Sequence, residues 1–345
     1  MKSSYIAVLL LVFAAGCTGL SGVFGGDILN IKQNLIQEGQ KDIVVIKDVS
    51  TIPKSPMLPE QSFVLTMLLE NIDKTEDARN VVVDLFNAPT VKKDDEPNKG
   101  NVCNAGSGSV CIPDKCSSEG CLMLPGEQIP INFYLKTPTE DEIVGIETKP
   151  SLDYRVTYDF ESSSLYVMPS VNLDEIIKNQ RSNDKVNVQV TKSYGTGPVR
   201  IDMELFGTPY ILSGQSATFI FKITNTGRGN VIGSQIDAGN FEVSIPKSLI
   251  GSGSLELPGG GAIEPGRYTQ TTERFSCTDD TTYVTCTNTD AIQLYKDQTR
   301  GSLRFEVKGV ADINQPFISY DIRASVKYRY ELRGTQEITV KPFES

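Results

Sequence analysis

The 345-residue sequence contains no histidine and no tryptophan. Histidine is the one side chain whose unperturbed pKa lies between about 5 and 8, and it is the commonest metal ligand. Its absence removes the usual general bases and many metal sites. The lack of tryptophan weakens a carbohydrate-binding interpretation, because exposed aromatic rings are the favoured platforms for sugars and quaternary amines. We therefore predict a protein that is not an enzyme and needs no cofactor.

Clusters of lysine and arginine are also missing. The chain has 33 basic and 43 acidic residues, a net charge of −10, and no basic run that could follow a phosphate backbone. Such a balance opposes nucleic acid as a partner. The composition, 39% hydrophobic and 22% charged, is that of a folded chain, and its length suits two domains.

The first 26 residues indicate export. Met1-Lys2 precedes an uncharged run whose most apolar part, Tyr5 to Ala15, has the length of a signal-peptide hydrophobic region. The run includes Phe13-Ala14-Ala15-Gly16-Cys17, which resembles a lipoprotein lipobox, with Ala14 where leucine is more usual. We predict that Cys17 carries lipid; the alternative is an uncleaved signal anchor, since the run is long enough to span a bilayer. Both place the chain at the outer face of a membrane.

From residue 42 the chain alternates between apolar and polar residues. Tyr154, Val156, Tyr158 and Phe160 share one face of a strand, and Ala324, Val326, Tyr328 and Tyr330 repeat the pattern. Short strands of this kind between turn signals predict an all-β protein. The capping box Asn172 to Glu175 predicts a short helix, which we place in an interdomain linker.

The apolar run Ser216 to Gly227 resembles the earlier segment Gln61 to Asn71, and each ends at or just after an asparagine. Matched positions follow in the same order: Asn71 precedes Asn225 by 154 residues, Phe133 precedes Phe305 by 172 and Tyr158 precedes Tyr328 by 170. The larger later offsets place an insertion in the second copy, and the Gly/Pro-rich stretch Gly251 to Gly266 is the candidate.

We therefore predict two tandem antiparallel immunoglobulin-like β-sandwiches with a short linker helix. In this division residues 1–26 are the signal peptide or anchor, 27–41 a stalk, 42–168 the first sandwich, 169–185 the linker and 186–343 the second sandwich. Each sandwich is expected to fold independently, because each has its own core.

A family resemblance rests on three features. These are the strand-Asn225-Thr226-Gly227-strand unit, the turn Leu124-Pro125-Gly126-Glu127 and the Phe-centred strand that follows it. Together they resemble the adhesion-related immunoglobulin-like modules of archaeal and bacterial surface and S-layer-associated proteins. The first copy departs from the pattern, because it reads Asn71-Ile72-Asp73. The resemblance covers both predicted sandwiches and implies a fold and a cell-surface location, with no catalytic residues.

Six cysteines remain besides Cys17. An even number in an exported chain predicts disulfides. Cys277 and Cys286 enclose eight residues, a spacing that suits neighbouring hairpin strands. Four more, Cys103, Cys111, Cys116 and Cys121, allow three pairings. These four could instead bind zinc, but they lack the two-residue spacings of zinc knuckles, so we favour disulfides.

Other candidate sites are weak. The acidic runs Asp94-Asp95-Glu96, Glu140-Asp141-Glu142 and Asp279-Asp280 could bind Ca²⁺, but no Asp-x-Asp-x-Asp-Gly loop occurs, and solvated turns are the simpler interpretation. The glycines Gly259 to Gly261 are not followed by Lys-Ser/Thr, so they do not form a phosphate-binding loop.

These observations predict a non-enzymatic, membrane-anchored cell-surface protein. It would act as an envelope scaffold or as an adhesion or interaction module with a protein partner. Partner contacts are expected in the unequal loops, Cys103 to Cys121 and Gly251 to Gly266, because loops on a β framework vary without disturbing the core. The alternatives are a solute-binding lipoprotein of a transporter and an exported hydrolase that uses carboxylates.

Overall fold

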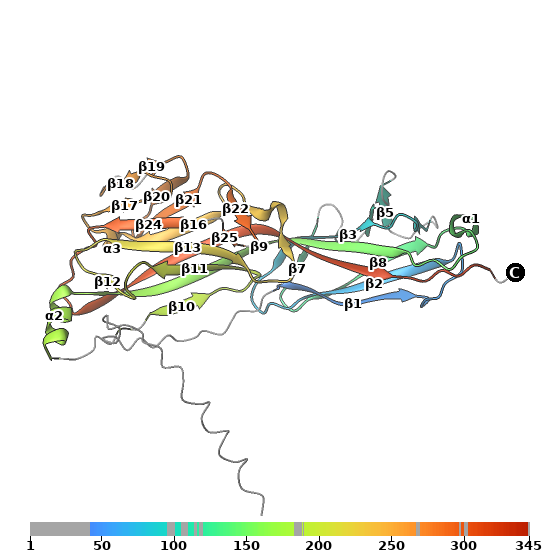
Figure 1. The fold of residues 1–345 in the computed structure, drawn as a ribbon, viewed down its shortest axis with the longest axis horizontal. Coiled ribbons are helices and arrows are strands. Elements are labelled where there is room, and N and C mark those ends of the chain that lie inside the picture. The colour runs from blue at the N-terminus through green and yellow to red at the C-terminus, as the bar shows by residue number, and fades with distance from the viewer. Residues whose placement is uncertain are drawn as a thin grey trace, which may run out of the picture.

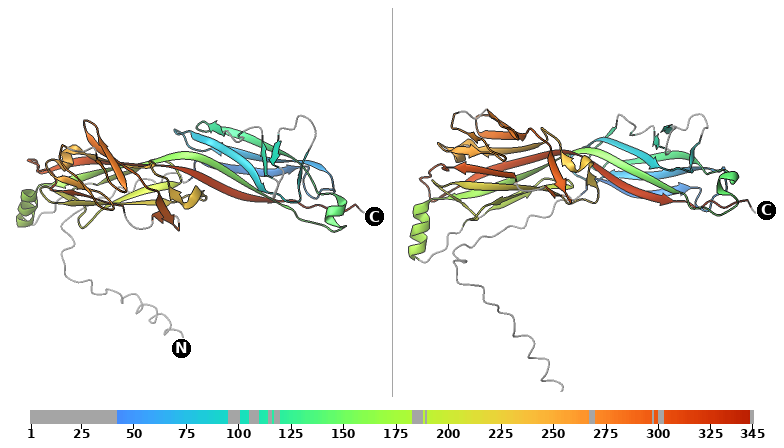
Figure 2. Two further views of the ribbon diagram at one scale, coloured as in Figure 1. Left: turned by 90° about the horizontal axis from the view of Figure 1, so that it is seen from above. Right: turned by 45° about the horizontal axis from the view of Figure 1, so that its top comes forward.

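The computed structural model describes residues 42–94, 101–104, 110–113, 116, 120–182, 188, 190–266, 270–296, 298–299 and 303–343. Strands account for 56% of the structure and helices for 8%, which confirms the predicted all-β class. The molecule is elongated, with two lobes end to end (Figures 1 and 2). Lobe 1 comprises residues 42–160 and 328–343, and lobe 2 comprises residues 161–327. The predicted signal peptide, Cys17 and the stalk lie outside the described residues.

Lobe 1 is a sandwich of two sheets. One sheet has the order β1 (Val44–Ile52), β2 (Ser62–Asn71), β8 (Gln128–Lys136) and β4 (Lys92–Lys93). Every second residue of β2 and β8 is buried, which is the alternation expected of half-buried strands. The facing sheet contains β3 (Ala78–Asn87), β5 (Asn101–Asn104), β6 (Val110–Pro113) and β7 (Cys121–Met123). Helix α1 (Glu140–Ile143) begins at the capping box of Thr139 and Glu142.

Lobe 2 is the larger sandwich. Its core includes the rings of Phe221, Phe241, Phe275 and Phe305, whose neighbouring centroids lie 5.2 to 6.4 Å apart in edge-on contacts. One sheet is formed by β11 (Val199–Leu205), β13 (Ala217–Asn225), β15 (Gln235–Ile236), β17 (Ser254–Glu256), β18 (Ala262–Ile263), β22 (Ile292–Tyr295), β23 (Gln298–Thr299) and β24 (Leu303–Lys308). The other contains β10 (Thr191–Tyr194), β12 (Ile211–Leu212), β14 (Asn230–Val231), β16 (Phe241–Pro246), β19 (Gln270–Thr271), β20 (Phe275–Asp279) and β21 (Tyr283–Asn288).

Two long strands join the lobes. Strands β9 (Ser151–Val171) and β25 (Phe317–Glu337) are 21 residues each and pair antiparallel without a register shift. Their register runs from Val171 opposite Phe317 to Ser151 opposite Glu337. At a rise of about 3.3 Å per residue, such a pair extends over roughly 70 Å. Both strands therefore belong to both sandwiches.

The structure divides the chain differently from the prediction. Residues 328–337, assigned to the second sandwich, pair with residues 151–160 of lobe 1, whereas residues 161–168, assigned to the first, lie in lobe 2. The two stripes interpreted as copies are direct neighbours, because Tyr158 lies opposite Tyr330 and Phe160 opposite Tyr328. Their similarity has a simple cause: paired strands that share one buried face also share its alternation.

The two lobes share one local arrangement of strands. In lobe 1 the middle strand β2 lies between β1 and β8, and in lobe 2 β13 lies between β11 and β24. Each middle strand ends at its asparagine. The Oδ1 atom of Asn71 accepts a bond from the Asp73 amide, and that of Asn225 accepts one from the Gly227 amide, both at 3.1 Å. The two similar sequence segments therefore mark two equivalent turns.

The predicted helix is present as α2 (Leu173–Ser182), and Asn172 Oδ1 accepts a 2.8 Å bond from the Asp174 amide at its start. It does not link the lobes but lies at the outer end of lobe 2, because β9 ends there and the chain returns through β10 (Figure 1). The stretch Gly251 to Gly266 is also more ordered than a loop. It contains β17 and β18, which extend the sheet from β24. Within the described ranges, no helix has the length and apolarity needed to cross a membrane.

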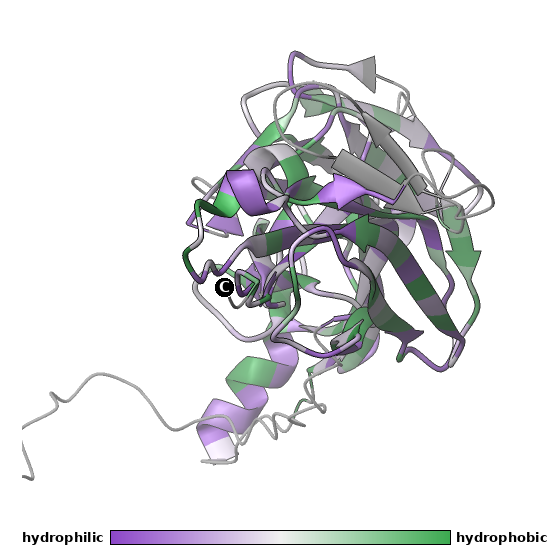
Figure 3. Ribbon diagram, turned by 90° about the vertical axis from the view of Figure 1, so that its right-hand side faces the viewer, coloured by the Kyte–Doolittle hydropathy of each residue, from purple (hydrophilic) through white to green (hydrophobic). Residues whose placement is uncertain are grey.

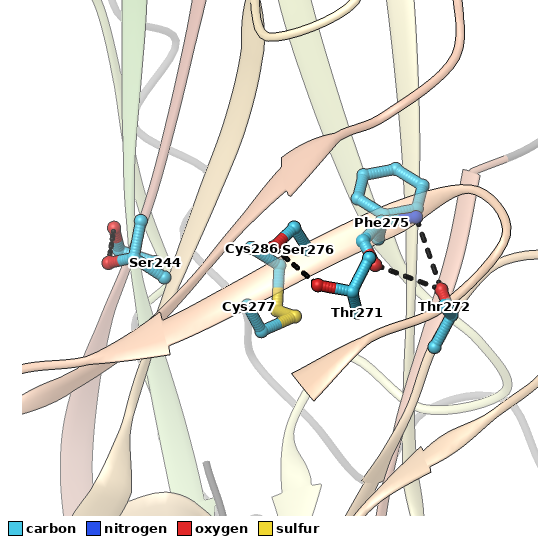
Figure 4. Close-up of a disulfide and its surroundings, with 8 residues drawn as sticks. Ser244, Thr271, Thr272, Phe275, Ser276, Cys277 and Cys286 are labelled. Atoms are coloured by element: carbon cyan, nitrogen blue, oxygen red, sulfur yellow. Dashed lines mark hydrogen bonds between the residues drawn. A yellow bond between two sulfur atoms is a disulfide. The ribbon is translucent and has the colours of Figure 1, made fainter. Parts of the chain in front are cut away.

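Two disulfides lie in the described residues. Cys277 and Cys286 face each other in β20 and β21 and are bonded, as predicted (Figure 4). Cys116 is bonded to Cys121, so the zinc alternative is wrong for these two residues. That bond leaves Cys103 and Cys111, which lie opposite each other in the register of β5 and β6.

We expect Cys103 and Cys111 to form the third disulfide. Non-reducing peptide mapping should recover three linked pairs, and free thiols at these positions would contradict the assignment.

Replacing both Cys277 and Cys286 with alanine should lower the free energy of unfolding by about 2 to 3 kcal/mol, through the entropy of the opened loop.

We also expect the two lobes to unfold together, because β9 and β25 are shared. Leu65→Ala empties a fully buried position on β2 of lobe 1 and should destabilise the chain by about 2 to 5 kcal/mol. Calorimetry should show one transition at a lower temperature, and hydrogen exchange should show a matching loss of protection in β13 of lobe 2. Ser62→Ala, at an exposed position of β2, is the matched control. Two separate transitions would show that the lobes are independent.

Candidate functional site

The two lobes meet at a waist where turns from both approach the shared strands. Lobe 1 contributes the segment after Asn71, and lobe 2 contributes the turn after Asn225 and the segment 237–240. Strand β14 of lobe 2 pairs with β25 here, with Asn230 opposite Glu331. The waist is therefore the place where side chains from distant parts of the sequence converge.

A cluster of tyrosines fills the interior of the waist. The ring centroids of Tyr158 and Tyr330 lie 5.6 Å apart, and those of Tyr328 and Tyr330 lie 6.2 Å apart. Tyr330 donates a 2.9 Å hydrogen bond to Asn225 Oδ1, and the hydroxyls of Tyr328 and Ser162 are 2.8 Å apart. Burial raises the pKa of Tyr158 and Tyr328 well above the ordinary value. Both phenols stay protonated at neutral pH, and Tyr158 contributes to the waist through ring packing.

Close backbone approach explains the glycine of the Asn-Thr-Gly motif. A Cβ atom at Gly227 would overlap Asp42 Oδ1 and the Tyr330 hydroxyl. Asp42 also accepts a 3.2 Å hydrogen bond from the Arg228 amide. The Asn-Thr-Gly motif thus has a structural role, because its glycine lets the lobe 2 turn pack closely against Asp42 and Tyr330.

A cleft of about 490 Å³ opens on one side of the waist. Its floor is formed by β9 and β25, and its walls by residues 76–80 of lobe 1 and 237–240 of lobe 2. The acidic side chains lining it are Glu76, Asp77, Asp159, Glu161 and Asp237, and the basic ones are Arg79, Lys327 and Arg329. The cleft therefore presents both signs of charge.

Ion pairs across the floor are long. Glu161 Oε2 lies 3.9 Å from Lys327 Nζ, and Asp159 Oδ1 lies 3.9 Å from Arg329 Nε. The second oxygen of Asp159 accepts a 2.7 Å bond from Asn80 of the lobe 1 wall. Half-exposed pairs of this kind contribute little to stability, so their groups are available to a polar partner at small cost.

The cleft is lined mainly by polar and charged side chains. Its charged groups are solvent-exposed, and no cleft residue combines a nucleophile with a neighbouring base in the manner of a covalent catalyst. Across the described ranges, no group of three or more Cys, Asp or Glu side chains is placed to share a metal ion.

The acidic runs considered for Ca²⁺ lie apart from one another. Glu140 to Glu142 form the first turn of α1, where Glu142 pairs with Lys92 at 2.7 Å. Asp280 accepts two 2.6 Å bonds from the amides of Thr282 and Tyr283, and Asp279 pairs with Lys247 at 2.6 Å. These groups act as caps and turn acceptors. Asp95 and Glu96 lie outside the described residues, as do the side chains of Cys103 and Cys111.

The sequence interpretation missed the cleft. Its floor residues lie on the polar faces of the same two strands whose apolar faces predicted the core, so the alternation did mark them as outward-facing. What it lacked was the pairing of those strands with each other. The loops predicted to bind partners, Cys103 to Cys121 and Gly251 to Gly266, do not line the cleft.

No protein-family model matches this chain, and no curated protein matches its sequence. Solved structures with a weak likeness include a partial N-terminal region of an enterococcal surface protein, with 8% identity over 83% of this chain and 92% of that one and a TM-score of 0.20. The collagen-binding domain of the Erysipelothrix rhusiopathiae surface protein RspB has 9% identity, coverages of 88% and 98% and a TM-score of 0.16. The collagen adhesin of S. aureus has 10% identity, coverages of 88% and 93% and a TM-score of 0.13. Similarity at this level does not establish a shared fold, and nothing is transferred from these proteins.

Asp73, in the lobe 1 turn, makes the stability of the fold depend on pH. Its side chain is 3% exposed, and Oδ1 accepts bonds from the amides of Thr75 at 2.7 Å and Glu76 at 2.8 Å. Burial acts to raise its pKa, but these hydrogen bonds outweigh burial and hold the pKa below the ordinary value. A depressed folded-state pKa stabilises the fold above the unfolded pKa of about 3.9, and this contribution is lost as the pH falls through the folded value.

We expect Asp73→Asn to lower the free energy of unfolding at pH 7 by roughly 1 to 3 kcal/mol, because hydrogen bonds to a charged acceptor are replaced by weaker ones. Below the folded pKa the variant and the natural protein should converge. Urea unfolding at pH 7 and at the lowest pH at which the natural protein stays folded measures both values. Asp48→Asn, at an exposed position of β1, is the control. An equal loss at both pH values would rule out the ionised carboxylate as the cause.

Proposed function

We propose that this chain is an exported, membrane-anchored, non-enzymatic surface protein that holds a polar binding cleft away from the membrane. The observation that carries the proposal is the uninterrupted pairing of β9 with β25 through both lobes. A continuous 21-residue ladder makes the two sandwiches a stiff rod with a cleft at its middle. A rigid framework that fixes the cleft walls of both lobes relative to each other is what a scaffold or an adhesion module requires.

Disulfide bonding supports the location. The Cys277–Cys286 and Cys116–Cys121 bonds are of the kind that persists in oxidising compartments and is rare in the cytosol. They agree with the hydrophobic leader and the Cys17 lipobox. In this proposal the lipid on Cys17 is the anchor, and the stalk 27–41 connects it to the waist, where the described chain begins at Asp42.

The shared strands also separate this proposal from a solute-binding lipoprotein. Such proteins close two lobes around a ligand by a hinge that absorbs large backbone rotations. Here the connection is a hydrogen-bonded pair of strands, reinforced at the waist by β14 on β25 and by the buried tyrosines. An open, charged cleft on a rod that cannot hinge favours a macromolecular partner over a small solute.

The carboxylates of the cleft do not favour the hydrolase alternative. Asp159 is bonded to Asn80 and lies beside Arg329, and Glu161 lies beside Lys327. Both carboxylates are thus engaged by neighbouring basic or amide groups as parts of the cleft floor. The partner is therefore proposed to be a protein of the cell envelope, held by charge complementarity at the cleft.

Proximity labelling from the full-length protein at its native cell surface tests this function. We expect structural envelope proteins to be labelled, and we expect Arg329→Glu to reduce their labelling, because it adds an acid to the cleft floor. Lys222→Glu changes charge equally at an exposed position of β13 outside the cleft and should leave labelling unchanged. Labelling of transporter permeases, or equal effects of both variants, would contradict the proposal.

A further inference from the structure

The exposed apolar side chains of this rod are concentrated at its two ends. Fourteen large hydrophobic residues are exposed within the described ranges, and ten of them lie at the ends. Pole 1, the free end of lobe 1, carries Ile52, Leu58, Val144, Ile146 and Phe343. Pole 2, the free end of lobe 2, carries Leu173, Ile177, Phe206, Phe317 and Ile318.

Three chain segments build pole 1. Lys341 donates a 2.9 Å backbone bond to Met57, and Phe343 donates a 3.4 Å bond to Glu140 of α1, which ties the segments around residues 52–58, 140–146 and 338–343 together. Val144 and Ile146 follow α1 directly and are 76% and 65% exposed. Figure 3 looks onto this end of the molecule, beside the C-terminus.

Pole 2 is assembled in the same way from distant segments. The Asn172 amide donates to the Pro316 carbonyl at 3.0 Å, which places the start of α2 beside the start of β25. Phe206 follows β11 and is fixed by a 2.9 Å bond from its amide to Thr218. Phe206 is 71% exposed and Phe317 is 58% exposed. The exposed apolar residues of pole 2 thus come from several elements that the fold holds in place.

We propose that pole 1 of one copy of this chain binds pole 2 of another, so that the rods associate head to tail. Five side chains that each expose roughly 100 Å² give on the order of 500 Å² of apolar surface at each pole, at the size that marks interaction sites. A standard interface buries about 800 Å² per partner, of which roughly 57%, or about 450 Å², is apolar. Each pole therefore supplies the apolar area that one such contact needs.

The opposite placement of the poles decides among possible occupants. A flat membrane can cover at most one end of a straight rod, and a symmetric dimer through one pole leaves the other exposed. Head-to-tail contact covers both poles with a single kind of interface, and such a contact repeats along a chain of copies. The net charge of −10 also disfavours side-by-side packing, which brings like charges together along the whole rod.

The position of the first described residue, Asp42, agrees with head-to-tail association. Asp42 lies at the waist, where it accepts a bond from the Arg228 amide. The 15-residue stalk 27–41 spans at most about 50 Å when extended. A rod tethered at its middle keeps both poles free to meet copies tethered to the same surface. This arrangement of tethered rods rests on the proposed anchor, whereas the contact between pole 1 and pole 2 does not.

Site-specific photo-cross-linking of the full chain in its native membrane tests the association. With the photoreactive analogue p-benzoylphenylalanine in place of Phe206, we expect a covalent dimer whose cross-link maps to residues 52–58, 143–146 or 338–343 of the second copy. The same probe at Thr278, an exposed flank position on β20, should give none. Cross-links to residue 206 of another copy, to lipid or to a different protein would overturn the proposal, as would no cross-link.

Two charge variants sharpen the test. Ile146→Asp disables pole 1 and Phe206→Asp disables pole 2, and each alone should reduce cross-linked dimer by about tenfold or more, because an unpaired carboxylate is costly to bury. Mixed together, the two variants should recover a dimer that cannot extend further, since each retains one intact pole. Probes at Phe317 and Phe343 report contact in these variants, and unchanged thermal unfolding confirms that they fold.

Recovery of neither dimer nor longer species in the mixture would contradict head-to-tail binding. Accessibility of the chain to protease on intact cells, measured in parallel, reports on the surface location. A chain that protease cannot reach on intact cells, but that still forms the cross-linked dimer, would reject the proposed anchoring alone. A chain that protease does reach on intact cells, but that forms no cross-linked dimer, would reject the association alone.

Discussion

The antiparallel pairing of β9 with β25 is the constraint on which the rest of this structure depends. Because 21 residue pairs stay in register, the buried face of one strand is matched by the buried face of the other through both lobes. The rest of their sheet is built outward from this pair, with β3 beside β9 in lobe 1 and β16 beside β25 in lobe 2. The waist, the cleft and the distance between the two poles follow from this single ladder.

The sequence predicted what depends on local pattern. Alternation identified the strands, Asn172 to Glu175 identified α2, and the spacing of Cys277 and Cys286 identified their bond. It did not predict which strands pair, because Tyr158 and Tyr330 are 172 residues apart and alternation is the same for any partner. Similar stripes were consequently interpreted as copies in separate domains. The asparagine turns do have the same hydrogen bond in both lobes, because such a turn needs specific atoms as well as a period.

The cleft is a product of the same long-range pairing. Asp159 and Glu161 alternate with buried residues on β9, and Lys327 and Arg329 do so on β25, so each was evident as an outward-facing charge. Their assembly into one floor, and the approach of Asn80 and Asn240 from either side, depends on tertiary contacts that no local pattern encodes. Polar sites on β scaffolds are therefore harder to predict than the cores beneath them.

The direction of the shared strands also determines how the molecule responds to mechanical force. A pull applied between the two ends of the rod acts along β9 and β25, parallel to the strand axes and perpendicular to their interstrand hydrogen bonds. In that shear geometry the bonds are strained together, whereas a pull across the sheet would break them one after another. The tyrosine cluster lies midway along this line and links the ladder to the turns of both lobes. The fold thus transmits tension from one pole to the other through this single pair of strands.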